Sequence, residues 1–274
     1  MQSKIGNNPM TEQPNYDMQR QIAADVLTKA GDRAGTQKQD VDLIEKVGAD
    51  FHNLLAGVQK MMHEDVITAL DRIFPDYGVL SPNQNIRPEA EFRWVLDPID
   101  GGVNFARGLP LWGSSLALLH HHQAVVGVIS IPDTSETYSA SLGGQAFRNG
   151  APIAVLKKRQ LADAVVAMTW GKTPAHRDRV LSAAQGLVPT TAEVLSVGAS
   201  SIALSWLAAG HIDAVVASGD LWEFAAGFLI AKQMGAVVTE WDGSRPTFRE
   251  RDFFTLVSTS QPLHDELVAV LKDR

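Results

Sequence analysis

Two stretches near the start of the chain carry apolar residues at helical spacing. Between residues 17 and 30, apolar side chains recur every three or four positions, which predicts a helix over 17–30 that ends at Gly31. The stretch 41–74 keeps the same period and predicts one long helix, weakened at Gly48 and Gly57. The beginning of the chain is therefore expected to be mainly helical.

Beyond residue 74 the apolar runs shorten to strand length. A proline-rich loop is expected over 75–88, and the expected strands are 93–96, 115–119, 124–131, 138–142 and 145–148. The polar run from His120 to Gln123 separates two of these strands and is typical of a hairpin turn. Short strands joined by turns predict a largely antiparallel sheet.

After residue 159 strands and helices alternate. The expected strands are 164–169, 213–217, 236–239 and 255–258, and the expected helices are 174–185, 198–209, 221–234 and a last one capped by Ser260. Alternation of this kind predicts α/β layering. We divide the chain into a flexible tail (1–15), an N-terminal α+β half with a mainly antiparallel sheet (16–155) and a C-terminal α/β half (156–274).

Composition narrows the classes of protein. Of the 274 residues 45% are apolar and 20% are charged, as in soluble globular proteins. The net charge of -7 provides no basic surface for nucleic acid or anionic lipid, so neither is an expected partner. No apolar run reaches the length of a membrane span, and no signal peptide is recognisable. Because cysteine is absent, disulfides and thiolate nucleophiles are excluded, and we expect a cytoplasmic protein.

The densest chemical pattern lies at residues 94–105. A strand delivers Asp97 at its carboxyl end, and Asp100 follows three residues later. Two carboxylates at this spacing can converge on one hard cation. The glycines Gly101 and Gly102 allow an anion to approach backbone N–H groups. A turn with two solvated aspartates explains the same residues, because Asp, Pro and Gly are common turn formers.

A second acidic position, Glu223, falls in the first turn of the helix expected over 221–234. Helix capping alone explains an acid there, because the helix dipole favours negative charge at its N-terminus. As a metal ligand, Glu223 would join Asp97 and Asp100 around one cation. Both interpretations remain open.

Histidines and serines provide weaker candidates. The run from His120 to His122 has the composition of a metal cluster, but its place at a hairpin tip favours a solvated turn. His52 and His63 lie where they could face the site, but exposed helical positions are the favoured prediction for both. The adjacent serines at 200 and 201 have no histidine and aspartate at a spacing typical of a hydrolase triad.

The two acidic motifs together resemble the inositol monophosphatase family. Residues 94–105 are similar to its W-x-x-D-P-I-D-G-T-x-N-F signature, and residues 222–227 to its W-D-x-A-A-G signature. Agreement extends to the blocks 147–150, 198–200 and 208–214. The resemblance implies a layered α-β-α-β-α sandwich, hydrolysis of phosphate monoesters of small molecules with up to three Mg²⁺ ions, and a homodimer.

Five positions depart from the family pattern. Where the resemblance implies two acidic metal ligands and a water-orienting threonine, this chain has Gln59, Asn83 and Gly102. Glu223 replaces the aspartate of the second signature, and Val216 stands where a substrate-binding glutamate is implied. Neutral amide oxygens are weaker ligands for Mg²⁺ than carboxylates are. The hydrolytic site is therefore predicted to be largely dismantled.

What remains of the implied site is one set of carboxylates. Asp97, Asp100 and Glu223 are the predicted catalytic residues and the predicted ligands of one Mg²⁺ ion, although a site that requires no metal also agrees with the sequence. The predicted substrate-binding residues are Gly101, Gly102, Val103 and Asn83.

Three functions remain open. The favoured one is a repurposed enzyme that uses the three acids for acid–base or electrostatic catalysis on a small polar or phosphorylated metabolite. The second is a Mg²⁺-dependent phosphomonoesterase with an altered metal set. The third is a non-catalytic binding or regulatory protein on the same fold.

Overall fold

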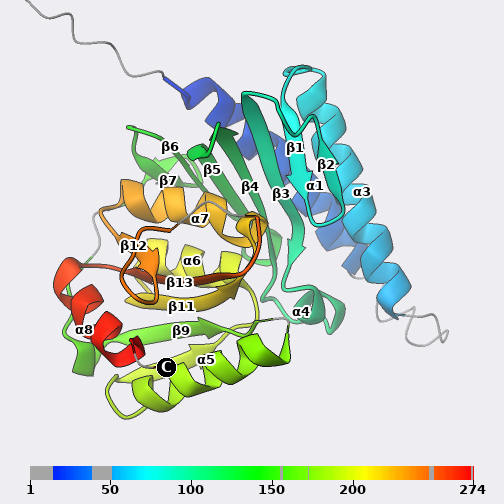
Figure 1. Ribbon diagram of the computed structural model, residues 1–274. Coiled ribbons are helices and arrows are strands. Elements are labelled where there is room, and N and C mark those ends of the chain that lie inside the picture. The colour runs from blue at the N-terminus through cyan, green and yellow to red at the C-terminus, as the bar shows by residue number, and fades with distance from the viewer. Residues whose placement is uncertain (1–14, 39–50, 155–156, 172, 247–249, 273) are drawn as a thin grey trace, which may run out of the picture.

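The computed structural model describes residues 15–38, 51–154, 157–171, 173–246, 250–272 and 274. These residues form five layers in the order helices, sheet, helices, sheet, helices (Figure 1). The expected α-β-α-β-α sandwich is confirmed. Among the described helices, none combines the length and the hydropathy that a bilayer crossing requires.

Three of the layers are helical. The outer face of the first sheet is covered by α1 (Asp17–Lys38) and α3 (Phe51–Asp71), and the outer face of the second by α5 (Pro174–Leu187) and α8 (Gln261–Leu271). Between the sheets lie α6 (Ser200–Ala209) and α7 (Leu221–Gln233).

The first helix runs past the glycine at which it was predicted to end. A Cβ atom added at Gly31 would lie 2.9 Å from Pro132 Cγ and 3.2 Å from Ser130 Oγ. Gly31 therefore allows close packing against the end of the first sheet, and the prediction of a helix stop there is wrong. Residues 41–50 of the predicted long helix, and the predicted tail apart from residue 15, lie outside the described residues.

Within the described residues the first sheet has eight strands in the order β2-β1-β3-β4-β5-β6-β7-β8. Their bounds are β1 Gly78–Ser81, β2 Gln84–Ile86, β3 Phe92–Asp100, β4 Gly113–His120, β5 Gln123–Ile131, β6 Glu136–Ser141, β7 Ala146–Arg148 and β8 Ala151–Pro152. Only the pair β1 and β3 is parallel. The hairpin between β4 and β5 turns at His121 and His122, where the sequence predicted it.

The prediction of a loop over 75–88 is wrong, because β1 and β2 lie in it. All four residues of β1 are buried, and Leu80 lies opposite Val95 of β3. Val79 and Leu80 are the only large apolar residues of β1, which is too short a run to predict a strand. Pairing with β3, rather than local pattern, makes this segment a strand.

Within the described residues the second sheet has five strands in the order β10-β9-β11-β13-β12. Their bounds are β9 Val165–Thr169, β10 Glu193–Ser196, β11 Ala214–Gly219, β12 Val237–Glu240 and β13 Phe253–Ser258. The strands β10, β9 and β11 are parallel, and Thr169 lies opposite Ala217. The carboxyl ends of β9 and β11 therefore meet at one edge, where open α/β sheets bind ligands.

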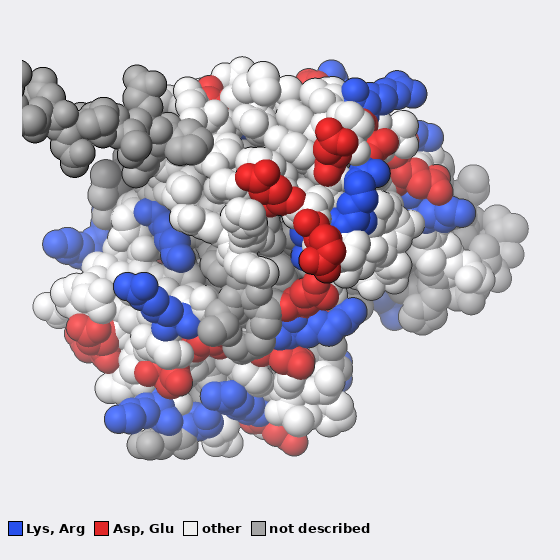
Figure 2. Space-filling view, turned by 45° about the horizontal axis from the view of Figure 1, so that its top comes forward, with Lys and Arg blue, Asp and Glu red and all other residues white. Residues whose placement is uncertain are grey.

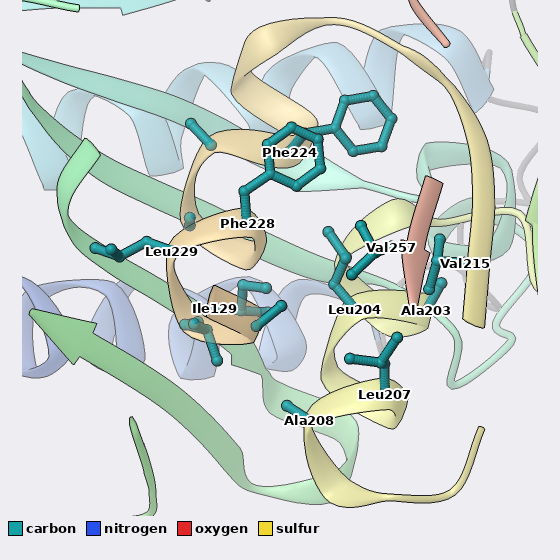
Figure 3. Close-up of a cluster of buried hydrophobic side chains, with 14 of the residues drawn as sticks. Ile129, Ala203, Leu204, Leu207, Ala208, Val215, Phe224, Phe228, Leu229 and Val257 are labelled. Carbon is teal, nitrogen blue, oxygen red and sulfur yellow. The ribbon is translucent and has the colours of Figure 1, made fainter. Parts of the chain in front are cut away.

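Hydrophobic clusters fill the spaces between the layers. In the central cluster, Phe224 and Phe228 of α7 stack with ring centroids 5.4 Å apart, close to Leu204 of α6 (Figure 3). All residues from Leu221 to Ala231 are buried. A helix that is apolar all round is stable only when protein surrounds it. This burial fixes α7, and with it the position of Glu223 in its first turn.

Figure 2 shows one face of the molecule coloured by charge. Among the described residues on this face, acidic and basic side chains are interspersed, and no large area carries one sign. This agrees with the small negative net charge of -7.

Candidate functional site

A cavity of about 530 Å³ opens between the end of β3 and the carboxyl edge of the second sheet. Its lining residues are Leu55, Gln59, Pro82, Asp97, Ile99, Asp100, Gly101, Gly102, Val103, Asn104, Thr169, Trp170, Gly171, Arg177, Gly198, Ala199, Ser200, Ser218, Trp222 and Glu223. The structure thus brings together every residue that the sequence predicted for the site except Asn83.

An irregularity in β3 turns both aspartates toward this cavity. Residues three apart in a regular strand point to opposite faces. Here the register with β4 shifts between Asp97, opposite Ser115, and Asp100, opposite Gly113, so that β3 contains one extra residue. Such a bulge redirects the following side chain. Asp97 and Asp100 are buried, at 5% and 7% exposure, and line the same cavity.

The chain leaves β3 through two glycines with different roles. Gly101 has a φ of 82°, and a Cβ atom there would lie 2.7 Å from the carbonyl oxygen of Leu111. Glycine is therefore required at the start of the short helix α4 (Gly102–Ala106). A Cβ atom added at Gly102 would meet Leu55 Cδ2 at 3.0 Å. The space beside Gly102 is thus lined by an apolar side chain of α3.

Glu223 is held by the first turn of α7. Its Oε2 accepts a hydrogen bond from the backbone N–H of Asp220 at 3.1 Å, as in a capping box. A Cβ atom added at Gly219 would lie 1.8 Å from the same oxygen. The carboxylate therefore occupies space that only a glycine at 219 leaves open. The capping role considered from the sequence is present, and Glu223 also lines the cavity.

Asp100 is held in a similar way by α6. Its Oδ2 accepts a hydrogen bond of 2.6 Å from the backbone N–H of Ser201 in the first turn of that helix. The partial positive charge of a helix N-terminus favours a carboxylate at this position. Two of the three cavity acids are therefore tied, through one oxygen each, to the N-termini of the two central helices.

Sequence reasoning missed the wall formed by the second sheet. Thr169 and Trp170 at the end of β9, Ser218 of β11 and Arg177 of α5 all line the cavity. The hydroxyls of Thr169 and Ser218 are buried and have no hydrogen-bond partner among the described residues. The predicted strands 164–169 and 213–217 contained the signal, because ligand sites form at the carboxyl ends of parallel strands.

Positions where the family pattern is broken lie in different places. Gln59 lines the main cavity and a neighbouring one of about 420 Å³, whereas Asn83 lines only the neighbouring cavity and is exposed. Val216 is fully buried in the cluster between the second sheet and the helices α5 and α8. Asn83 and Val216 are therefore apart from the residues around Asp97.

His63 also lines the neighbouring cavity, and the prediction that it is exposed is wrong. It is 9% exposed, and its Nε2 lies 3.1 Å from Ser81 Oγ. Burial lowers the pKa of His63, against a smaller opposing effect of Glu64, and thereby favours the neutral imidazole. The side chain of His52, the other histidine of α3, lies outside the described residues.

Among the described residues, side chains able to bind one metal ion jointly are close together in one place. Groups of three or more His, Asp or Glu with ligand atoms all within 4.8 Å of one another occur among these residues only at Glu91, His120 and His121. Asp97, Asp100 and Glu223 are spaced more widely, so one cation bound to all three requires their side chains to move inward. Carboxylate donors of this kind suit a hard cation.

Comparison with known proteins decides the family. The model of the "Inositol monophosphatase family" matches residues 10–273, which is nearly the whole chain. The chain belongs to the inositol monophosphatase family. This agrees with the two signatures, which lie on β3 with α4 and on α7 and meet in one cavity.

Individual relatives carry different names. The fructose-1,6-bisphosphatase/inositol-1-monophosphatase of Thermotoga maritima is 27% identical over 234 residues, which cover 85% of this chain and 88% of that protein. The Nus factor SuhB of Xylella fastidiosa is 27% identical over 233 residues, which cover 81% and 83%. Inositol monophosphatase II of Staphylococcus aureus superposes with a TM-score of 0.80 at 20% identity, covering 94% of each chain, which shows the shared fold.

Proposed function

We propose that this inositol monophosphatase family member binds a small phosphorylated metabolite in the cavity together with one divalent cation. Asp97, Asp100 and Glu223 hold the cation. In this proposal the site acts on its ligand by acid–base or electrostatic chemistry, and phosphomonoester hydrolysis is slow or absent. The observation that carries it is a cavity that keeps three buried carboxylates while Leu55 covers Gly102.

Three buried acids support a cation. Each is at most 8% exposed and lines the same cavity, and carboxylate oxygens are the ligands that hard cations such as Mg²⁺ prefer. Arg177 lines the same cavity, and its Nε donates to the carbonyl oxygen of Gly171 at 3.2 Å. A bound cation would stabilise the acids by direct coordination and would attract a phosphate oxygen.

The second-sheet wall supports a polar metabolite. The buried hydroxyls of Thr169 and Ser218 need hydrogen-bond partners, and a ligand with its own hydroxyl or phosphate oxygens provides them. The indole of Trp170 is 43% exposed on the same wall and offers an apolar face. Arg177 can donate to an anionic oxygen.

Weak hydrolysis is expected because apolar Leu55 lies beside Gly102 and because Gln59 is neutral. The family threonine orients the attacking water, whereas here the apolar Leu55 lies beside the glycine. Without that hydroxyl and without the acidic ligand replaced by Gln59, the nucleophile is poorly generated. We expect turnover at least about 10³-fold below a typical relative.

Two other functions have some support. A Mg²⁺-dependent phosphomonoesterase is favoured by the name of the Thermotoga maritima relative. A non-catalytic binding role is favoured by the capping bonds of Asp100 and Glu223 and by a relative named as a Nus factor. A homodimer and a cytoplasmic location stay predictions from the resemblance and the composition.

The test combines binding with catalysis. Calorimetry with a panel of phosphate monoesters, with and without Mg²⁺, is run beside a phosphatase assay on the wild type and the triple variant Gln59→Asp, Asn83→Glu, Gly102→Thr. A fourth change, Leu55→Ala, gives the new threonine room, and Leu181→Ala at an exposed site of α5 is its matched control.

The proposal predicts Mg²⁺-dependent binding by the wild type and hydrolysis only in the variants, greatest when Leu55 is also replaced. Wild-type turnover near 10 s⁻¹ would refute it in favour of the phosphatase. No binding of any monoester or of Mg²⁺ would favour the non-catalytic alternative.

A further inference from the structure

A second group of metal-ligating side chains lies at the hairpin between β4 and β5, outside the cavity. Glu91 directly precedes β3, and the register of the first sheet places Phe92 opposite His120 at the end of β4. The backbone N–H of His121 donates to the carbonyl oxygen of Glu91 at 2.9 Å, which fixes the turn against the start of β3. Two imidazoles and one carboxylate are thereby brought together.

The distances in this group suit a common metal ion. His120 Nε2 lies 2.9 Å from Glu91 Oε1, and one ligand atom from each of the three residues lies within 4.8 Å of the others. Zinc bonds to nitrogen and oxygen are about 2.0–2.2 Å, so two such ligands are about 2.9 Å apart at a right angle and about 3.4 Å apart in a tetrahedron. The exposed ring of His121 stacks on that of His120 with centroids 4.6 Å apart, so it has to rotate out of this stack to direct a nitrogen at the same ion.

The surroundings of His120 already position its ring. It stacks on Phe92 with centroids 4.5 Å apart and an interplanar angle of 10°, and its Nδ1 lies 3.3 Å from the Tyr16 hydroxyl. A histidine ligand commonly uses its second ring nitrogen in such a hydrogen bond, which sets the tautomer.

We propose that Glu91, His120 and His121 form a Zn²⁺ site, with water in the fourth position. Two histidines and one glutamate are an established zinc ligand set, and imidazole favours zinc over Mg²⁺. Glu91 and His121 are exposed, so the ion enters from solvent without a large desolvation cost. The bound ion would link the hairpin tip to β3 and, through Tyr16, to the start of α1.

This site is separate from the cavity in both place and chemistry. None of its three ligands is among the residues that line the cavity, and the cavity acids are all oxygen donors. The proposal therefore does not depend on the proposed function. The solvated turn expected from the sequence accounts for His121 and His122 but not for the ordered contacts of His120 with Glu91, Phe92 and Tyr16.

The test is a zinc titration of the full chain without a histidine tag, by calorimetry in millimolar Mg²⁺, which occupies carboxylate sites. The wild type is compared with Glu91→Gln and His121→Ala, both at exposed positions, and with the matched control His211→Ala, an exposed histidine elsewhere. Urea unfolding of each variant shows whether it is folded, since His121 has a φ of 52°. Tyr16→Phe tests the hydrogen bond to the ligand, and Asp97→Asn tests the cavity.

We expect one Zn²⁺ per chain at micromolar concentration in the wild type, in His211→Ala and in Asp97→Asn. Affinity should fall at least about 10-fold in Glu91→Gln and His121→Ala, and about 10-fold in Tyr16→Phe. No binding by the wild type at micromolar zinc, equal binding by the two ligand variants, or loss of binding in Asp97→Asn would each overturn the proposal.

Discussion

Replacement of Glu223 by glutamine or by alanine separates its two roles. Glutamine keeps a side-chain oxygen that can accept the hydrogen bond from the Asp220 backbone, because Glu and Gln both serve in capping boxes. Alanine removes that acceptor. Only the glutamate has the negative charge that cation binding requires, so the two variants differ in the cap and share the loss of charge.

The structure sets the expected magnitudes. Loss of the 3.1 Å hydrogen bond in Glu223→Ala should lower the free energy of unfolding by about 1–2 kcal/mol, as for other capping residues. Glu223→Gln should change it by no more than about 0.5 kcal/mol without Mg²⁺, because removal of one of three buried negative charges offsets a weaker hydrogen bond.

Mg²⁺ then distinguishes the variants from the wild type. At a free concentration 100 times the dissociation constant, the ion should stabilise the wild type by about 2.7 kcal/mol. If loss of the charge weakens binding about 100-fold, the same concentration stabilises Glu223→Gln by only about 0.4 kcal/mol.

The assay is urea unfolding followed by tryptophan fluorescence, with and without MgCl₂, on the three proteins. Equal Mg²⁺ stabilisation of the wild type and Glu223→Gln would show that Glu223 holds no cation. If Glu223→Gln without Mg²⁺ lost as much free energy of unfolding as Glu223→Ala, the charge itself, and not the hydrogen bond, would cap α7.

Three further changes test other parts of the structure. Gly219→Ala places a Cβ atom 1.8 Å from Glu223 Oε2, so it should displace the carboxylate and reduce both stability and the Mg²⁺ effect in the same urea assay. Gly101→Ala should cost about 1–3 kcal/mol, because φ is 82° and the Leu111 carbonyl would lie 2.7 Å from the new Cβ; unchanged unfolding would contradict the strained geometry. Burial lowers the pKa of His63 and of His264, so on acidification the unfolded chain takes up protons before the folded one. The free energy of unfolding should therefore fall as the pH drops below about 6.5. His264→Gln should make this fall shallower, and an equal slope of the free energy against pH in both proteins would contradict the assignment.

The fold class, the family resemblance and most of the acidic site were predictable from the sequence. Helical spacing in 17–30, short strands before residue 150 and alternation after it predicted a largely antiparallel sheet followed by α/β layering, because burial of one face imposes a period that is visible locally. The five-layer sandwich was implied by the family resemblance. The two signatures identified Asp97, Asp100 and Glu223, which line one cavity. The departures from the family pattern at Gln59 and Gly102 could also be recognised from the sequence, because they are changes of residue type.

Contacts between residues far apart in the chain became visible in the folded protein. The bulge between Asp97 and Asp100 arises from pairing with β4, and β1 is a strand because β3 lies beside it. Gly31 packs on Pro132 instead of ending its helix, and His63 is buried next to Ser81. Each of these features depends on contact with a residue far away in the sequence, which a local sequence pattern does not reveal.

The same reason applies to the chemistry of the two sites. Trp170 and Arg177 join the cavity because β9 and α5 bring them to the edge at which β3 ends. Leu55 lies beside Gly102, and Glu91 contacts His120, although the residues of each pair are far apart in the sequence. Residue type and spacing determine what a segment can do chemically, but close contact between segments depends on the packing of the layers, which the whole sequence specifies at once.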